Sequence, residues 1–207
     1  MTLKESSNPY GYRDLLVYRK AEDLQRTCAA LTKLFPREKT LTALADQMDR
    51  SARSVKQNIV EGWKRNSTKE YYEFLGFSLG ANSELEEDCN DILKGIYEMG
   101  GRGLKMEKDW DLESVEKLPF YPLDTQLPPV IQLKLRTKEL NLLLTKLQNS
   151  LVSKMRENNT LSLTDRQRVQ KSQEKGKDAW LDEAIQAHGL ERLPNGQLVE
   201  KLKTSLQ

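Results

Sequence analysis

Apolar side chains recur at steps of three and four residues along four stretches of the chain, 14–34, 41–61, 67–99 and 130–157. This spacing places them on one side of an amphipathic α-helix. In the first two stretches the apolar positions are Val17, Ala21, Leu24, Cys28, Leu31 and Phe35, followed by Leu41, Leu44, Met48, Ala52, Val55 and Ile59. The pattern therefore predicts four long helices.

Local signals mark where these helices begin and end. Pro36 ends the first helix, because proline clashes with the preceding turn, and we expect Gly62 to end the second. Ser67 followed by Glu70 is a capping-box pattern, in which both side chains can satisfy free amides of the first turn. We expect the third helix to end at residues 99–101, Met-Gly-Gly.

Four such helices predict an all-α protein whose main domain, residues 1–157, is an antiparallel up-and-down four-helix bundle. Residues 102–129 form a long connection with four prolines, which we expect to be ordered and to contain a short helix near 112–118. Residues 158–207 are polar and form a predicted helical extension. Within it, Pro194-Asn-Gly196 predicts a turn between two short helical stretches.

The composition argues against several classes of protein. The longest apolar runs are too short to cross a bilayer and the N-terminus has no apolar signal core, so we expect a cytoplasmic protein. Cys28 and Cys89 lack metal-ligand spacing, and we find neither a Gly-rich phosphate loop nor a catalytic triad. We therefore expect a non-enzymatic protein without a metal or another cofactor.

The net charge of +2 is unevenly distributed along the chain. Residues 84–124 hold twelve acids against five bases, whereas residues 130–177 hold eleven bases against four acids. This asymmetry predicts a molecule with a sided electrostatic field. For any single charge, an ordinary solvated helix face remains the alternative.

A candidate nucleic-acid interface follows the second predicted helix. At 100° per residue, Arg50 and Arg53 lie opposite the apolar stripe, and Lys64 continues their row if the helix passes Gly62. Such a row of cations can meet phosphates. The alternative is a solvated face on which Asp46, Asp49 and Glu61 neutralise the cations. The candidate residues here and in the later basic stretch are Arg50, Arg53, Lys56, Lys64, Arg65, Lys69, Lys134, Arg136, Arg166 and Arg168.

Aromatic residues cover more than one side of the third predicted helix, which predicts a second buried surface between subunits. Base stacking by these rings is the alternative. Asn58 and Glu61, at the end of the second apolar stripe, can cap helix ends or bond across the same boundary. The candidate oligomer-interface residues are Tyr71, Tyr72, Phe74, Phe77, Asn58 and Glu61.

Several spaced motifs in the first hundred residues resemble one family. The opening motif is Tyr12-Arg-Asp-Leu-Leu-Val-Tyr18 with Ala21, and the corner motif is Phe35-Pro36 with Glu38. The helix motifs comprise Met48, Arg50, Ser51, Ala52, Ser54, Val55, Asn58, Ile59, Glu61 and Gly62, then Ser67, Tyr71, Phe74, Leu75, Gly80, Glu84 and Leu85. They resemble the four-helix bundle proteins encoded in intervening sequences of bacterial 23S ribosomal RNA genes. That family includes the accessory variability proteins of diversity-generating retroelements.

The resemblance covers residues 12 to about 93, with a looser fit at 130–157. For accessory variability members it implies a pentameric barrel, a basic surface that binds RNA or DNA, and a reverse transcriptase as partner. The segments 102–129 and 160–207 depart from the family pattern. The leading hypothesis is a homo-oligomeric adaptor that binds nucleic acid, RNA in preference to DNA, beside a reverse transcriptase. The alternative is a protein-only oligomeric scaffold whose C-terminal segment recruits a partner protein.

Overall fold

A computed structural model describes residues 8–97, 110–160, 185, 190–192 and 198–200. The helical character expected from the apolar spacing is confirmed for every long element in this part of the chain. The elements are the 3-10 helix η1 (Gly11–Asp14), the helices α1 (Leu16–Thr32), α2 (Lys39–Lys64), α3 (Thr68–Leu93), α4 (Leu112–Glu116) and α5 (Pro129–Thr160), and the strands β1 (Leu190–Arg192) and β2 (Leu198–Glu200).

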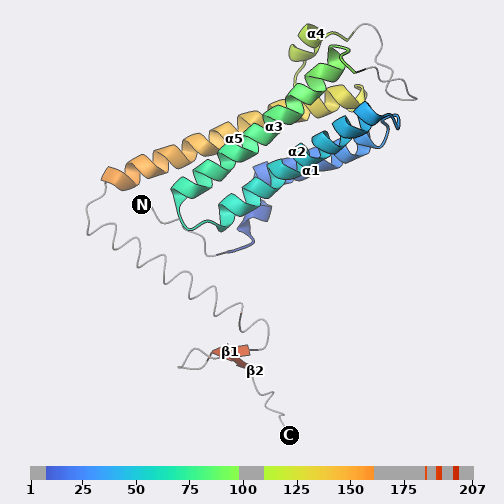
Figure 1. Cartoon of the computed structure of the whole chain (residues 1–207). Coiled ribbons are helices and arrows are strands. Elements are labelled where there is room, and N and C mark those ends of the chain that lie inside the picture. Colours follow the sequence, from blue (N-terminus) through green and yellow to red (C-terminus); the bar gives the residue numbers. More distant parts are fainter. Residues whose placement is uncertain (1–7, 98–109, 161–184, 186–189, 193–197, 201–207) are drawn as a thin grey trace.

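The four long helices enclose one core. Helix α1 packs against α2 and α5, and α3 packs against the same two helices, so each long helix has two long neighbours. Successive long helices run in opposite directions, as the colours of Figure 1 show. None of the described helices combines the length and the apolar character needed to cross a bilayer.

The predicted apolar stripes point inward. All of the stripe positions of the first two helices are buried, and Met48, Ala52 and Val55 have no exposed surface. Leu75 and Leu85 of α3 and Leu140 and Leu144 of α5 meet them in the same core. Spacing alone therefore identified the inner face of each helix.

The expected end of α2 was wrong, because α2 passes Gly62 and continues to Lys64. Gly62 is buried where α2 meets α3. A Cβ atom at this position would lie 2.8 Å from Cβ of Phe74 and 2.8 Å from Cδ2 of Tyr71. The glycine thus allows close approach of two helices, and Lys64 remains on the helix that carries Arg53.

Both ends of α3 have specific caps. Oγ of Ser67 accepts a hydrogen bond from the backbone N–H of Glu70 (3.1 Å), which confirms the predicted N-cap. The Glu70 carboxylate accepts from the Ser67 hydroxyl (2.7 Å). The helix ends at Leu93, before the expected 99–101, because Gly95 adopts φ +72° and a Schellman pattern closes the helix. In it the N–H of Gly95 donates to the Ile92 carbonyl, and that of Ile96 donates to the Asp91 carbonyl.

The part of the long connection from residue 110 onward covers one end of the core, whereas 102–109 lie outside the described residues. Its short helix α4 confirms the expected helical turn, and Oδ1 of Asp111 caps it by accepting from the N–H of Ser114 (2.7 Å). Val115 of α4 is fully buried. Trp110, which precedes α4 in the sequence, and Phe120, which follows it, pack against the core. The first turns of α5 are therefore enclosed on more than one side. The buried residues there are Val130, Ile131, Leu133, Lys134, Leu135 and Thr137.

The C-terminal segment was predicted to be helical, and its described residues 190–192 and 198–200 are instead two antiparallel strands. Leu190 lies opposite Glu200, and Arg192 lies opposite Leu198. Two short runs separated by a five-residue connection that contains glycine are typical of a β-hairpin. Most of the predicted extension, including the turn at 194–196, lies outside the described residues.

Candidate nucleic-acid interface

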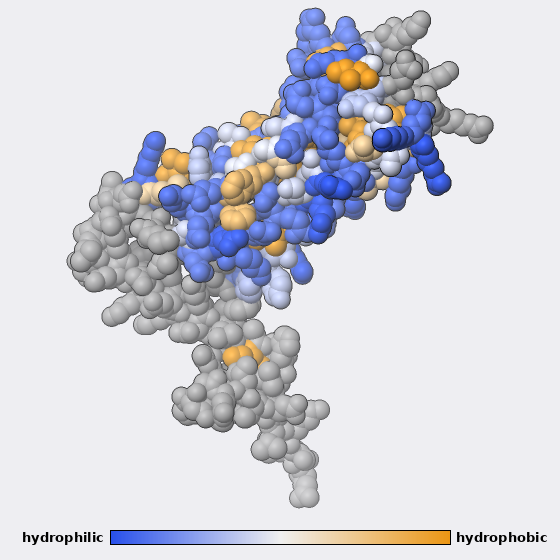
Figure 2. Space-filling model, in the orientation of Figure 1, coloured by the Kyte–Doolittle hydropathy of each residue, from blue (hydrophilic) through white to orange (hydrophobic). Residues whose placement is uncertain are grey.

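The basic row of α2 lies on the outside of the molecule. Arg50, Arg53 and Lys64 are exposed, and Lys56 is half-buried beside them. Arg65 follows α2 directly and is also exposed. The outer surface visible in Figure 2 is largely hydrophilic, with isolated hydrophobic patches. The structure thus places this part of the predicted interface where a polyanion can reach it.

Three of the six predicted cations from Arg50 to Lys69 have acidic partners one helical turn away. Arg50 pairs with Asp46, Arg65 pairs with Glu61 at 3.7 Å, and Lys69 of α3 pairs with Glu73 at 3.8 Å. All three pairs are exposed, and such pairs contribute little to stability, so a phosphate can displace the carboxylate. The ion pairs that the alternative interpretation expects are therefore present for Arg50 and Arg65.

Arg53, Lys56 and Lys64 form no ion pair with any carboxylate in the described part of the chain. Asp49, which was expected as an intrahelical partner, instead accepts hydrogen bonds from the Thr32 hydroxyl at 3.1 and 3.2 Å. Among the predicted interface residues of α2, the positive charge without an acidic partner therefore lies at these three.

Lys134 is not a surface residue, which corrects its assignment to the interface. Only 2% of it is exposed, because it lies where α5 packs against α3. Its ammonium group donates to Oδ1 of Asn90 and lies 3.7 Å from Oε1 of Glu86, both on α3. A lysine held in this way cannot meet a phosphate. Arg136 is half-buried, and Arg166 and Arg168 lie outside the described residues.

The contacts of Lys134 belong to a polar layer between α3 and α5. The Asn82 amide donates to the Thr137 carbonyl (2.9 Å) and to Oδ1 of Asn141 (2.7 Å). The Asn141 amide in turn donates to Oε2 of Glu86 (2.8 Å). This layer joins the two helices side by side and has no counterpart in the sequence prediction.

A second polar contact joins α2 to α3. The Gln47 amide donates to Oδ1 of Asp88, which is buried, at 3.0 Å. Burial, together with the nearby negative charges of Asp91 and Glu84, raises the pKa of Asp88 to about 6. The Asp88 carboxyl group therefore stays protonated up to a higher pH than an ordinary aspartate.

The predicted aromatic interface residues divide into buried and exposed ones. Tyr71 is 3% exposed and lies edge-on to Trp63 with ring centres 6.1 Å apart, so it belongs to the core and not to an outer interface. Burial also raises the pKa of its phenol. Tyr72 and Phe74 are half-buried. Phe77 is 60% exposed and packs edge-on against Phe74 at 5.6 Å.

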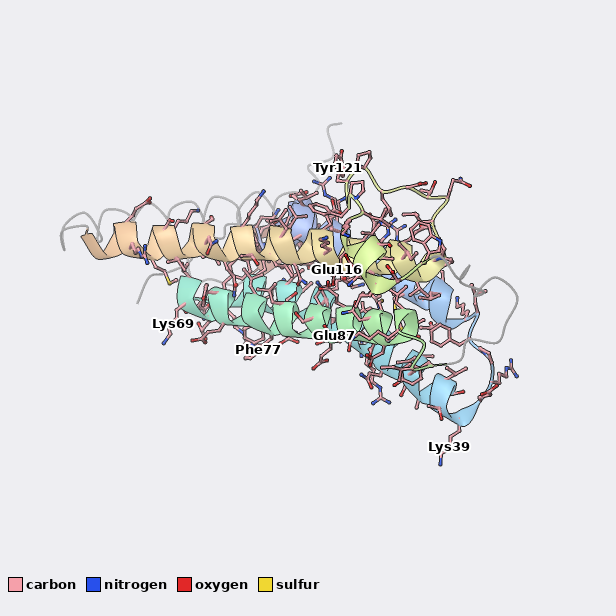
Figure 3. The ribbon with its side chains drawn as sticks, turned by 90° about the horizontal axis from the view of Figure 1, so that it is seen from above. Lys39, Lys69, Phe77, Glu87, Glu116 and Tyr121 are labelled. Carbon is pink, nitrogen blue, oxygen red and sulfur yellow. The ribbon has the colours of Figure 1, made fainter. Side chains whose placement is uncertain are left out.

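Phe77 is the part of this set that is available for contact with another molecule. Figure 3 shows it on the outer edge of α3, between Lys69 and Glu87. Large apolar side chains exposed in this way mark candidate interfaces when they lie beside other apolar groups. Of the other predicted interface residues, Asn58 donates to Oγ of Ser54 (3.2 Å) within α2, and Glu61 pairs with Arg65.

A comparison with known protein families relates the first three long helices to one family. Residues 13–95 match the 23S rRNA-intervening sequence protein family. The match extends from the end of η1 through α1, α2 and α3 to Gly95, and it confirms the resemblance expected from the sequence motifs. The connection through α4, helix α5 and the C-terminal segment lie beyond the matched residues. No curated protein matches the chain.

An aromatic and basic cluster lies at the start of the matched region, and the sequence did not predict it. Tyr10 and Tyr12 of the N-terminal turn lie beside the cations of Arg13 and Lys64. The only local signal is the turn-forming run Asn8-Pro-Tyr-Gly11. That signal cannot reveal the cluster, since Lys64 is more than fifty residues away in the sequence.

The described residues offer no evident site for a metal. No group of three or more His, Cys, Asp or Glu side chains in this part of the chain is arranged to hold one. Cys28 and Cys89 are both buried, and burial raises the pKa of each thiol, which keeps them protonated and unreactive. Of the predicted site residues and the cluster described above, the candidates for function are the cations of α2, the cluster at its end and Phe77.

Proposed function

We propose that the protein is a non-enzymatic, homo-oligomeric adaptor that binds nucleic acid, RNA in preference to DNA, through the outer face of α2. The observation that carries this proposal is the set Arg53, Lys56 and Lys64, whose charges no described carboxylate neutralises. The match of residues 13–95 to the 23S rRNA-intervening sequence protein family supports an RNA context.

The proposed scaffold is an antiparallel up-and-down four-helix bundle made of α1, α2, α3 and α5. Support comes from the contacts of each long helix with two others and from their alternating directions. Within this scaffold, Arg53 and Lys64 are separated by about 16 Å along α2, at about 1.5 Å per residue. Cations at this spacing contact backbone phosphates and do not read base sequence, so the ligand is selected by its shape and charge.

A reverse transcriptase is the protein partner in this proposal. The support is the resemblance to accessory variability proteins, which also implies five subunits. An oligomer would repeat the α2 surface around an axis, and linked weak sites bind a long RNA with greater affinity than one site alone. The adaptor would thus hold a structured RNA beside the enzyme that copies it.

Reversing two of the uncompensated charges is expected to weaken RNA binding. Arg53→Glu with Lys56→Glu should lower the affinity for a structured RNA by about tenfold or more, because two phosphate contacts become repulsive. The slope of log affinity against log salt should become less steep by about 1.4 if the contacted phosphates belong to an unpaired strand, and by about 1.8 if they belong to a duplex stem. Fluorescence anisotropy with a labelled RNA hairpin, at several salt concentrations, measures both quantities.

The matched control is Lys33→Glu with Arg37→Glu, which makes the same change of charge at the corner between α1 and α2. Both residues are exposed. The control should bind RNA within about twofold to threefold of the wild type, after correction for the changed net charge. Equal losses in the two variants, or a wild-type protein without salt-dependent affinity for RNA, would contradict the proposed interface.

A protein-only scaffold is the second candidate function, in which residues 158–207 recruit a partner protein. Two observations favour it. Arg50, Arg65 and Lys69 already have carboxylate partners, and Phe77 offers an apolar contact to protein. RNA binding by the wild-type chain separates the two candidates, because only the adaptor requires it.

Both candidate functions require an oligomer, and Phe77 provides its test. Phe77→Ser should shift the wild-type mass in multi-angle light scattering toward that of the monomer, since burying a phenylalanine contributes about 1.5–3 kcal/mol per interface. Its helical content should change little, because the side chain is exposed within one chain and does not belong to the core. A wild-type protein that runs as a 23.9 kDa monomer would disprove the oligomer.

A further inference from the structure

We propose that Tyr10, Arg13 and Lys64 form a binding site for one unpaired nucleotide of an RNA strand. The two cations would hold a backbone phosphate, and the ring of Tyr10 would stack on the adjacent base. This assignment rests on the proposed function and deepens it, because it distinguishes unpaired RNA from duplex.

The two cations are brought together by aromatic rings. Nζ of Lys64 lies 4.8 Å and Cζ of Arg13 lies 5.2 Å from the ring centre of Tyr10. Both cations also lie within 6 Å of the ring centre of Tyr12, at 5.9 and 5.8 Å. Neither is in an ion pair with a carboxylate of residues 8–97 or 110–160. Two cations that lie near the same two rings, without an acidic partner, favour an anion beside them.

The turn that carries Tyr10 and Arg13 is fastened to the end of α2. The carbonyl of Asn8 accepts a hydrogen bond from the indole N–H of Trp63 (3.1 Å). Gly11 lies directly on the Trp63 ring, since a Cβ atom there would be 2.7 Å from Cζ2. Trp63 precedes Lys64 in α2, so these contacts set the distance between Lys64 and the turn. The cluster is therefore ordered before any ligand binds, which lowers the entropic cost of binding.

Tyr10 is the ring of this cluster that a base can reach. It is 55% exposed, whereas Tyr12 is buried and packs edge-on against Tyr18 at 5.0 Å. Exposed aromatic rings beside cations are the usual platform for single-stranded nucleic acid, because every base offers a flat face. A base within a duplex is already stacked on its neighbours and cannot reach such a ring. The ligand of this site is therefore a loop, bulge or single strand.

The site lies at the end of the basic row of α2. Lys64 belongs to the same helix as Arg53 and Lys56, and the three follow one another along its exposed side. A strand whose phosphates contact Arg53 and Lys56 therefore runs toward Tyr10. This continuity favours a nucleic-acid strand over a free nucleotide as the natural ligand.

The test compares the full-length chain and its variants against a single-stranded RNA octamer and a blunt RNA duplex of the same length. Arg13→Gln with Lys64→Gln should bind the octamer about tenfold more weakly than the wild type, with a salt slope reduced by about 1.4. Lys33→Gln with Arg37→Gln removes the same charge at the α1–α2 corner and should change the octamer affinity less than threefold. Affinity for the duplex should fall less than affinity for the octamer.

The aromatic part of the site is tested separately. Tyr10→Leu should weaken octamer binding about tenfold, while Tyr10→Phe, which keeps the ring, should bind like the wild type. Thermal melting of each variant shows whether the fold is retained, and the binding of Tyr10→Phe separates stacking from any general effect of altering the turn.

Equal octamer affinities for the Arg13/Lys64 variant and its control would overturn the site, while the proposed function would stand if Arg53→Glu with Lys56→Glu still lost binding. A wild-type chain that binds neither RNA would overturn both. Adenosine monophosphate that binds as tightly as the octamer would overturn the assignment to a strand and identify a free nucleotide instead.

Discussion

Replacing Lys134 with alanine should lower the free energy of unfolding by about 3 kcal/mol or more. The lysine is 2% exposed, and its ammonium group contacts Asn90 and Glu86 across the boundary between α3 and α5. Alanine removes the cation, leaves the Glu86 carboxylate without its positive neighbour, and creates a cavity where the aliphatic part of the side chain was. Urea unfolding followed by circular dichroism measures the loss.

Two further variants separate charge from packing at Lys134. Lys134→Met with Glu86→Gln removes both charges and keeps most of the volume, and it should unfold within about 1 kcal/mol of the wild type. The Asn141 amide can still donate to the glutamine carbonyl at position 86, as it does to Glu86. Lys146→Ala, on the exposed side of the same helix, is the control and should change stability by less than about 0.5 kcal/mol.

The opposite result would be informative. If Lys134→Ala were as stable as Lys146→Ala, the first turns of α5 would be open to water in solution. In that case Lys134 would be accessible to solvent, and it would again be a candidate for contact with phosphate.

Replacing Gly62 with leucine should lower the free energy of unfolding by about 3 kcal/mol, and Gly62→Ala by about 1 kcal/mol or more. The reason is the close packing of α2 on α3. The first added carbon would lie 2.8 Å from both Phe74 and Tyr71, and one of these atoms is the Cβ of Phe74, which cannot move without its backbone. The clash exceeds the helix-propensity gain of about 1 kcal/mol that alanine offers over glycine.

Gly80 is the matched control, since it lies in the neighbouring helix α3 and a Cβ atom there would meet nothing within 4 Å. Gly80→Ala should therefore raise the free energy of unfolding by about 0.5–1 kcal/mol. Opposite signs for the two alanine variants in the same urea experiment are the expected outcome. A stabilising Gly62→Ala would mean that α2 and α3 lie farther apart in solution than this structure places them.

The local rules of the sequence predicted much of the fold. Steps of three and four residues identified the buried side of α1 and α2, as the burial of Leu24 and Met48 shows. The Ser67 cap and the short helix α4 were also found, because each depends on residues close together in the chain. Part of the basic row of α2 was predictable for the same reason, since helical geometry relates Arg53 to Arg50.

The wrong predictions concern residue types that can occupy two different environments, which only the tertiary structure distinguishes. A glycine near a predicted helix end is either a stop or a point of close contact, and Gly62 is the second. A lysine in a basic stretch is usually exposed, and Lys134 is not, because its ammonium group lies against Asn90 and Glu86 of α3. Tyr71 was assigned to an outer interface for a similar reason, although it packs against Trp63.

By itself, the sequence determined the helices, their inner faces and the residues that cap them, because these follow from backbone geometry over a few neighbouring positions. Tertiary structure alone decided which cations stay uncompensated and which residues meet at the end of α2. Tyr10 and Lys64 become neighbours only because Trp63 fixes the N-terminal turn against the helix. Burial and charge pairing depend on contacts between distant segments, and no local pattern encodes them.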